Sequence, residues 1–131
     1  MMNNNCKILD YPVRIESEFI TALYPDVEDE LKKIFEKSGQ KSKFAQQLKQ
    51  RIKYLEENKE KCILHKEWFE NYTDMEWLYS LRVKGQFHNF RMYFIFKDNQ
   101  AIILHAFLEK RKSDIDKAKK IAVNRRKTLY N

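Results

Sequence analysis

The stretch WLYSLRVKGQFHNFRMYFIFKDNQAIILHAFLEKRK, residues 77–112, contains three apolar, aromatic-rich runs separated by two turn signals. Gly85 supplies conformational freedom at the first turn, and Asp98-Asn99 suits a two-residue hairpin turn. The runs therefore predict an antiparallel meander with strands over about 77–83, 88–97 and 101–108. The last two strands are apolar on both faces, which is typical of strands covered from both sides.

Two helices are predicted before the meander. Pro25 and the acids that follow it favour a helix start, and Gly39 favours a helix end, so the first helix spans about 25–38. Apolar residues recur at helical spacing over about 41–58, at Phe44, Leu48, Ile52 and Leu55. The two helices form a hairpin whose apolar faces need a sheet to cover them.

The remaining segments are shorter. Residues 13–16 alternate like a strand, and Pro12 either limits the start of that strand or places it at an edge. Residues 60–75 predict an irregular or extended connector, with a loop at 71–74. Ser113 is a good N-cap for a C-terminal helix over about 113–129, whose outer surface is basic.

Length and composition indicate one α+β domain over residues 1–131. We expect an N-terminal strand and a helical hairpin packed on a mainly antiparallel sheet, followed by the basic helix. No run is long enough for a membrane span, and the first residues do not resemble a secretory signal. Two distant cysteines, Cys6 and Cys62, predict no disulfide framework, so we expect a cytoplasmic protein with inert thiols.

The positive charge is concentrated at the end of the chain. Residues 1–109 carry 17 Lys and Arg and 17 Asp and Glu, whereas residues 110–131 carry nine and two. The whole net charge of +7 therefore lies in the last segment. Such an end favours a polyanion such as RNA or DNA, or an acidic protein, although a solvated basic helix face fits equally well.

Strand alternation sorts the cations of the meander. The side chains of Arg82, Lys84, Arg91 and Tyr93 share one face, opposite the apolar face that should lie under the helical hairpin. A two-residue turn at Asp98-Asn99 would pair Arg91 with Ala106. It would also place His105 beside Met92, as a core or capping residue rather than a catalyst.

The two sheet arginines are candidates for phosphate binding. Between residues 77 and 108 the only acidic residue is Asp98, so Arg82 and Arg91 have no evident local partner. An arginine offers a planar fork of donors that matches a phosphate. Structural pairing with a distant carboxylate is the alternative.

Three sequence segments resemble the RelE/HigB superfamily of type II toxin–antitoxin toxins, and most closely its phage-derived HigB-like branch. They are Leu78-Tyr79-Ser80-Leu81-Arg82, Phe90-Arg91-Met92-Tyr93-Phe94, and Ile102-Ile103-Leu104-His105-Ala106-Phe107 followed by Lys110-Arg111-Lys112. Residues 113–118 and the basic helix also fit that branch. The resemblance covers about residue 36 to the end of the chain.

The resemblance implies a RelE-like fold and an mRNA interferase that cuts translated mRNA, usually on the ribosome. It also implies a helix-turn-helix antitoxin as partner, and no metal or other cofactor. In this family the RNA 2′-OH attacks the adjacent phosphate while basic residues assist. A lysine can act as the base only where neighbouring cations lower its pKa from about 10.4 toward neutrality.

The matching positions imply roles for individual residues. Arg82 and Arg91 would hold the scissile phosphate, and one residue of the run Lys110, Arg111 and Lys112 would act as acid or phosphate clamp. Further RNA-binding candidates are Lys66, Lys84, Tyr93, Lys119 and Arg125. Ribosome-dependent members often carry a base-stacking tyrosine where this chain has about Asp116, and Tyr93 or Tyr130 could substitute.

Two other functions are compatible with the same sequence. One is a non-enzymatic toxin like the ParE-type toxins that poison gyrase, and the other is a nucleic-acid-binding or protein-binding module. The cations on the sheet favour the nuclease, whereas a site that needs only the C-terminal helix would favour one of the alternatives.

Overall fold

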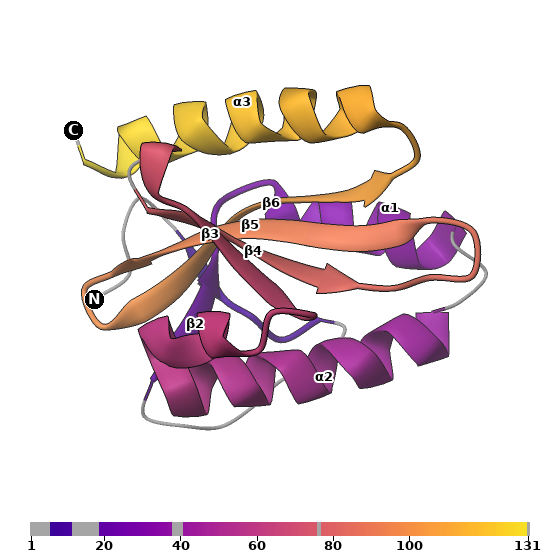
Figure 1. The fold of residues 1–131 in the computed structure, drawn as a ribbon, viewed down its shortest axis with the longest axis horizontal. Helices are drawn as coiled ribbons and strands as arrows, with labels where there is room; N and C mark the ends of the chain where they lie inside the picture. The colour runs from indigo at the N-terminus through magenta and orange to yellow at the C-terminus, as the bar shows by residue number, and fades with distance from the viewer. Residues whose placement is uncertain (1–5, 12–18, 38–40, 76, 131) are drawn as a thin grey trace.

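The chain adopts an α+β fold in a computed structural model that describes residues 6–11, 19–37, 41–75 and 77–130. Within those residues the sheet has six strands in the order β1-β2-β6-β5-β4-β3 (Figure 1). Strand β2 runs parallel to β6, and all other neighbours are antiparallel. The strands are β1 (Lys7–Ile8), β2 (Ile20–Leu23), β3 (Phe69–Tyr72), β4 (Leu78–Val83), β5 (Asn89–Lys97) and β6 (Gln100–Glu109).

The three predicted helices are confirmed. They are α1 (Val27–Lys37), α2 (Lys41–Asn58) and α3 (Lys112–Leu129), and two short 3₁₀ helices span Lys59–Leu64 and Thr73–Met75. The predicted N-cap at Ser113 is wrong, because α3 already begins at Lys112. The carboxylate of Asp114 instead accepts hydrogen bonds from the backbone N–H groups of Lys110 and Arg111, at 2.9 and 2.8 Å.

The predicted meander is also confirmed, as strands β4, β5 and β6. Asp98 and Asn99 both have positive φ, 54° and 59°, as the two central residues of a tight hairpin turn do. Lys97 and Gln100 pair directly on either side of them. The turn chemistry alone therefore defines the β5–β6 connection.

The connector before the meander holds a strand that the sequence did not reveal. Asn71 and Tyr72 were predicted to be loop residues, but both lie in β3, where they pair with Tyr79 and Leu78. The predicted strand at residues 13–16 lies outside the described residues. The N-terminal strands that the structure does describe are β1 and β2.

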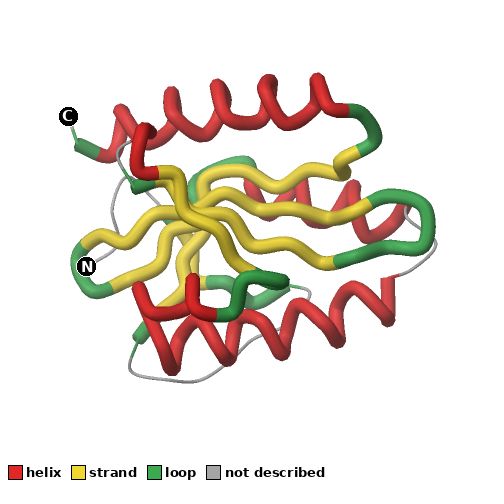
Figure 2. The backbone as a smooth tube through the Cα atoms, in the orientation of Figure 1, coloured by secondary structure: helices red, strands yellow, loops and turns green. Residues whose placement is uncertain are grey.

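The sheet separates two apolar cores. Helices α1 and α2 cover one face and α3 covers the other, so the sheet forms a middle layer (Figure 2). The first core joins the two helices to the apolar face of the meander, as predicted; its members include Val27, Leu31, Phe35, Phe44, Leu48, Ile52, Leu81, Phe90, Met92, Phe94 and Ile103. The second core includes Leu78, Tyr93, Ile95, Ile102, Leu104, Ala118, Ala122 and Leu129.

A β-bulge interrupts the pairing of β5 with β6. Phe94 pairs with Ile103 and Tyr93 pairs with His105, so Leu104 is an extra residue. The predicted pairing of Arg91 with Ala106 is therefore wrong, and Arg91 pairs with Phe107. A one-residue shift moves side chains to the other face, which places His105 opposite Tyr93 instead of Met92.

The remaining compositional predictions concern cysteines and membranes. Cys6 and Cys62 are free and buried. Burial raises the pKa of both thiols, for Cys62 to about 12, which agrees with inert side chains. None of the described helices is long and apolar enough to cross a membrane.

Gly85 fixes the β4–β5 loop, and its replacement is expected to destabilise the protein. A Cβ at this position would lie 2.0 Å from the carbonyl oxygen of His88 and 2.9 Å from a ring carbon of Phe44. Overpacking of this kind costs roughly 1–3 kcal/mol, so Gly85→Ala should lower the free energy of unfolding by that amount in urea titrations. Lys84→Ala, at an exposed neighbour, is the control, and equal stability of the two variants would contradict the close packing.

Candidate phosphate-binding site

Two arginines face each other across the centre of the meander. Arg82 on β4 and Arg91 on β5 are direct cross-strand partners, on the sheet face opposite α1 and α2. Like charges in directly opposed positions repel each other, so this arrangement requires anions nearby. The two guanidinium groups differ in how that requirement is met.

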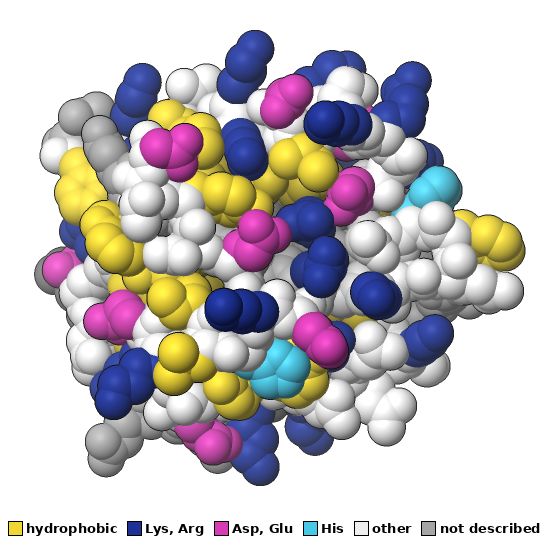
Figure 3. All heavy atoms as spheres, in the orientation of Figure 1, with side chains coloured by type: hydrophobic (Ala, Val, Ile, Leu, Met, Phe, Trp, Pro, Cys, Tyr) yellow, Lys and Arg dark blue, Asp and Glu magenta, His cyan; other side chains and the backbone are white. Residues whose placement is uncertain are grey.

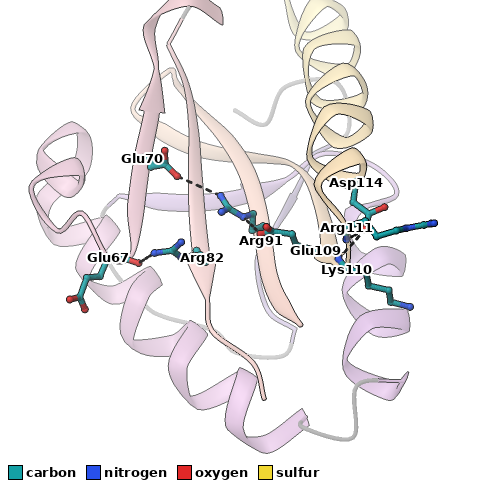
Figure 4. Close-up of polar contacts among 8 residues, drawn as sticks. All are labelled: Glu67, Glu70, Arg82, Arg91, Glu109, Lys110, Arg111 and Asp114. Carbon is teal, nitrogen blue, oxygen red and sulfur yellow. Dashed lines mark hydrogen bonds and ion pairs between the residues drawn. The ribbon is translucent and has the colours of Figure 1, made fainter. Parts of the chain in front are cut away.

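Arg91 is a buried arginine with two carboxylate partners. Its Nε donates to Glu109 at 2.5 Å, and its Nη1 lies 3.6 Å from Glu70 (Figure 4). The prediction that Arg91 lacks a local partner is therefore wrong. Burial alone would lower its pKa, but the hydrogen bond and charge of Glu109 outweigh burial and raise it. Arg91 is held in position as a fixed cation, 7% exposed.

Arg82 is less enclosed than Arg91. Its Nη2 donates to the backbone carbonyl of Glu67 at 3.1 Å, and among the described residues it makes no ion pair. One of the five N–H donors of its guanidinium is therefore bound to a carbonyl, and none is paired with a carboxylate of the described residues. A cation of this kind beside a fixed second arginine is suited to a bound phosphate.

A third arginine supports the site from the other side of the strand. Arg51 on α2 donates from Nε to the carbonyl of Arg82 at 2.8 Å, and its guanidinium lies 4.5 Å from the centre of the Trp68 ring. Burial, and then the charge of Arg82, lower the pKa of Arg51. Its contacts fix the β4 backbone at the position of Arg82.

The run Lys110, Arg111 and Lys112 follows β6 at the same end of the sheet. The pairing of Asn89 with Glu109 brings the start of this run beside the strand that carries Arg91. All three side chains are exposed. In Figure 4 the side chains of Lys110 and Arg111 extend away from Arg91, so the structure brings their backbone, not their charged ends, to the arginine pair.

The other predicted binding residues are dispersed. Tyr93 is 0% exposed, and burial followed by the neighbouring Tyr72 raises its pKa, so its ring is not available to RNA. The ammonium of half-buried Lys119 lies 4.4 Å from the centre of the Tyr72 ring. Lys84 is exposed at the start of the β4–β5 loop. Lys66, also exposed, precedes the residue whose carbonyl binds Arg82.

Arg125 belongs to a partly buried ionic cluster at the edge of β6. The carboxylate of Glu30 on α1 accepts from the Ala106 N–H at 3.1 Å, lies 3.0 Å from His105 Nδ1, and pairs with Arg125 at 2.9 Å. Arg125 also donates to the carbonyl of Leu104 at 2.8 Å. These contacts join α1, β6 and α3 at the bulge, so they explain His105 and Arg125 as structural residues.

The face that carries Arg82 and Arg91 is less open than the strand alternation suggests. Helix α3 packs over its Tyr93 and Ile95, so only part of this face is free to present cations. Acidic and basic side chains also alternate across the surface seen in Figure 3. The cations around the arginine pair are the half-buried Arg82 and the exposed Lys66, Lys84, Lys110, Arg111 and Lys112.

The sequence patterns did not indicate three acidic residues that bind the arginines of the structure: Glu30, Glu70 and Glu109. Glu109 lies one residue beyond the end of the predicted last strand, and only the bulge places it on the face of Arg91. Glu70 lies in β3, a strand that the sequence of residues 60–75 did not predict. Nothing local indicates Glu30, which is 76 residues from Ala106.

The site offers cations and carboxylates but no evident metal centre. Among the described residues no three His, Cys, Asp or Glu side chains gather as metal ligands.

Comparison of the chain with protein-family models, curated proteins and solved structures finds no match. The arrangement could bind a phosphate at Arg82 and Arg91, and Glu70, whose 53% exposed carboxylate lies 3.6 Å from Arg91, could exchange a proton.

Proposed function

We propose that the chain is the toxin of a type II toxin–antitoxin pair and acts as a metal-independent endoribonuclease on translated mRNA. The observation that supports this function is the cross-strand pair Arg82 and Arg91, of which one guanidinium is fixed by carboxylates and the other is not. The resemblance of the meander to RelE/HigB toxins adds the substrate class. The basic run 110–112 adds cations at the same end of the sheet.

In the proposed reaction the 2′-oxygen of one nucleotide attacks the adjacent phosphorus, and the bond from phosphorus to the 5′-oxygen breaks. The 2′-OH proton passes to a base, and a proton is supplied to the departing 5′-oxygen. The products are a 2′,3′-cyclic phosphate and a 5′-hydroxyl. Arg82 and Arg91 stabilise the negative charge that grows on the phosphate oxygens.

The proposal takes its base from beside Arg91 and its acid from the basic run that follows β6. The half-exposed Glu70 carboxylate lies 3.6 Å from Arg91 and can accept the proton of the 2′-OH. The proton for the leaving oxygen would come from a lysine of the 110–112 run, whose exposed side chain must turn toward the bound phosphate, because that of Lys110 extends away from Arg91 in Figure 4. The partner of the proposed toxin is a helix-turn-helix antitoxin, whose acidic segment would neutralise the basic end of the sheet.

Purified protein incubated with mRNA, both free and on ribosomes, tests the reaction. We expect cleavage in excess chelator, 5′-hydroxyl product ends, and no cleavage at a position whose ribose carries a 2′-O-methyl group. Cleavage that continues at the methylated position would contradict attack by the 2′-oxygen. Growth arrest with intact mRNA and broken chromosomal DNA would indicate gyrase poisoning instead.

A further inference from the structure

Arg51 on α2 is a buried cation that has no carboxylate partner among the described residues. It is 8% exposed, and its contacts are two backbone carbonyls and the ring of Trp68. Arg91 is buried to a similar degree, but it is paired with Glu109. Because a buried charge without a counter-ion is costly, an arginine at this position indicates a role beyond packing.

The start of β3 explains which hydrogen bond Arg51 makes. The backbone N–H of Arg82 donates to the Trp68 carbonyl at 2.9 Å, one step beyond the terminal β3–β4 pair. In an antiparallel ladder two such residues exchange both N–H···O bonds, so the Trp68 N–H should donate to the Arg82 carbonyl in return. It donates instead to the carbonyl of His65, at 3.1 Å. Nε of Arg51 takes its place and donates to the Arg82 carbonyl at 2.8 Å, which completes the ladder at Arg82.

The guanidinium of Arg51 is itself held from several sides. It lies 4.5 Å from the centre of the Trp68 ring, and that ring stacks on His65 with 3.9 Å between the ring centres. Its Nη1 donates to the carbonyl of Gln47, one turn earlier on α2, at 3.1 Å. Helix α2 therefore fixes the β4 backbone at Arg82 through a side chain that is packed in one position.

Arg51 also adds positive charge behind Arg82. A neutral side-chain amide could donate to the same carbonyl, so the hydrogen bond alone does not account for a charged group. Burial lowers the pKa of Arg51, and the charge of Arg82 lowers it further, because the two guanidinium groups repel each other. A bound phosphate would relieve this repulsion, and Arg82 is the partly exposed member of the two.

We propose that Arg51 is a positioning residue of the RNA-cleaving site, which holds Arg82 in place and strengthens the positive potential at the bound phosphate. This inference rests on the proposed function and assigns it a residue that does not itself touch the RNA. Arg51 acts through Arg82, because it is buried and binds the Arg82 backbone. Misplacement of a reacting group by about 1 Å can reduce a rate about 10²-fold, so the loss of Arg51 should be measurable as slower cleavage.

A double-mutant cycle on the cleavage of ribosome-bound mRNA tests this role. Arg51→Met is expected to reduce the cleavage rate about 10-fold or more, and Arg51→Lys, which keeps the charge, should recover part of it. Lys53→Met removes a charge from the exposed surface of the same helix and should cleave like wild type. In the Arg82→Ala background, Arg51→Met should have little further effect, because the residue through which it acts is gone.

Nuclear magnetic resonance of the arginine side chains gives a second readout, which does not depend on RNA. The order parameter of the Arg82 Nε–H group, from ¹⁵N relaxation, should fall in Arg51→Met and keep its wild-type value in Lys53→Met. The same spectra show whether each variant is folded. If Arg51→Met does not fold, Arg51→Lys, which loses the Nε donor, takes its place in both measurements.

The outcomes separate this inference from the proposed function. Equal cleavage by folded Arg51→Met and Lys53→Met would overturn the positioning role and leave the nuclease proposal intact. An equal loss with and without Arg82 would also overturn it, because Arg51 would then act independently of Arg82. Absence of cleavage by the wild type would overturn the proposed function and with it the effect on cleavage. In that case an unchanged Arg82 order parameter in Arg51→Met would overturn the positioning of Arg82 as well, and a lower one would support it.

Discussion

Arg82→Ala is expected to reduce RNA cleavage about 10²- to 10³-fold and to abolish growth arrest, while the protein remains folded. The guanidinium of Arg82 is the cation beside Arg91 that has no carboxylate partner among the described residues, so its loss removes stabilisation of the phosphate in the transition state. Its one hydrogen bond, to the Glu67 carbonyl, contributes little to stability. The measurement is the cleavage rate of the purified variant on ribosome-bound mRNA.

Two comparisons make the Arg82 result specific. Lys49→Ala removes one positive charge from the exposed surface of α2, which covers the opposite face of the sheet, and should cleave at the wild-type rate. Arg82→Lys keeps the charge but loses the planar fork, so it should recover only part of the activity. Arg91→Ala is a poorer test, because it would leave Glu109 without its partner and would destabilise the fold as well. Full activity in Arg82→Ala would contradict the assignment.

Glu30→Ala is expected to have the largest effect on stability, about 3 kcal/mol in the free energy of unfolding. The Glu30 carboxylate binds His105, Arg125 and the Ala106 N–H together, and its removal leaves a partly buried arginine and a strand-edge N–H without their acceptor. Urea titration measures the change. Glu36→Ala, an exposed acid on the same helix, is the control and should change stability little.

The pH dependence of Glu30→Ala follows from the pKa of the lost carboxyl. Burial by itself would raise the pKa of Glu30, but hydrogen bonds from His105 and Arg125, with that from Ala106, lower it below its usual value. Its contribution to stability is therefore complete above the unfolded-state pKa of about 4.3, and it is lost as pH falls through the lower folded-state pKa. The wild type and the variant should converge in acid, and a difference that is independent of pH would contradict this cause.

Helices and turns could be predicted because their signals are local. The spacing of Phe44, Leu48 and Ile52 defines α2, and the backbone preferences of Asp98-Asn99 define the β5–β6 turn. Alternation also predicts which side chains of β4 and β5 share a face, because each face of these strands packs into one of the two cores. The fold class therefore needed no information beyond the sequence pattern.

The β3 strand and the bulge could not be predicted, because long-range contacts determine them. The segment Phe-Glu-Asn-Tyr is short and carries two polar residues in the middle, and it becomes a strand only by pairing with β4. The bulge at Leu104 coincides with the contacts of Arg125 and Glu30 to the β6 edge. Without the bulge and β3, the carboxylates of Glu109 and Glu70 could not be placed beside Arg91.

The most direct test of the proposed function is a map of mRNA 5′ ends after brief induction of the wild type and of Arg82→Ala in growing cells. The proposal predicts new 5′-hydroxyl ends within translated messages for the wild type, and none for Arg82→Ala at equal protein levels. Growth arrest without new ends, or the same set of ends with Arg82→Ala, would contradict an RNA-cleaving site at this arginine pair.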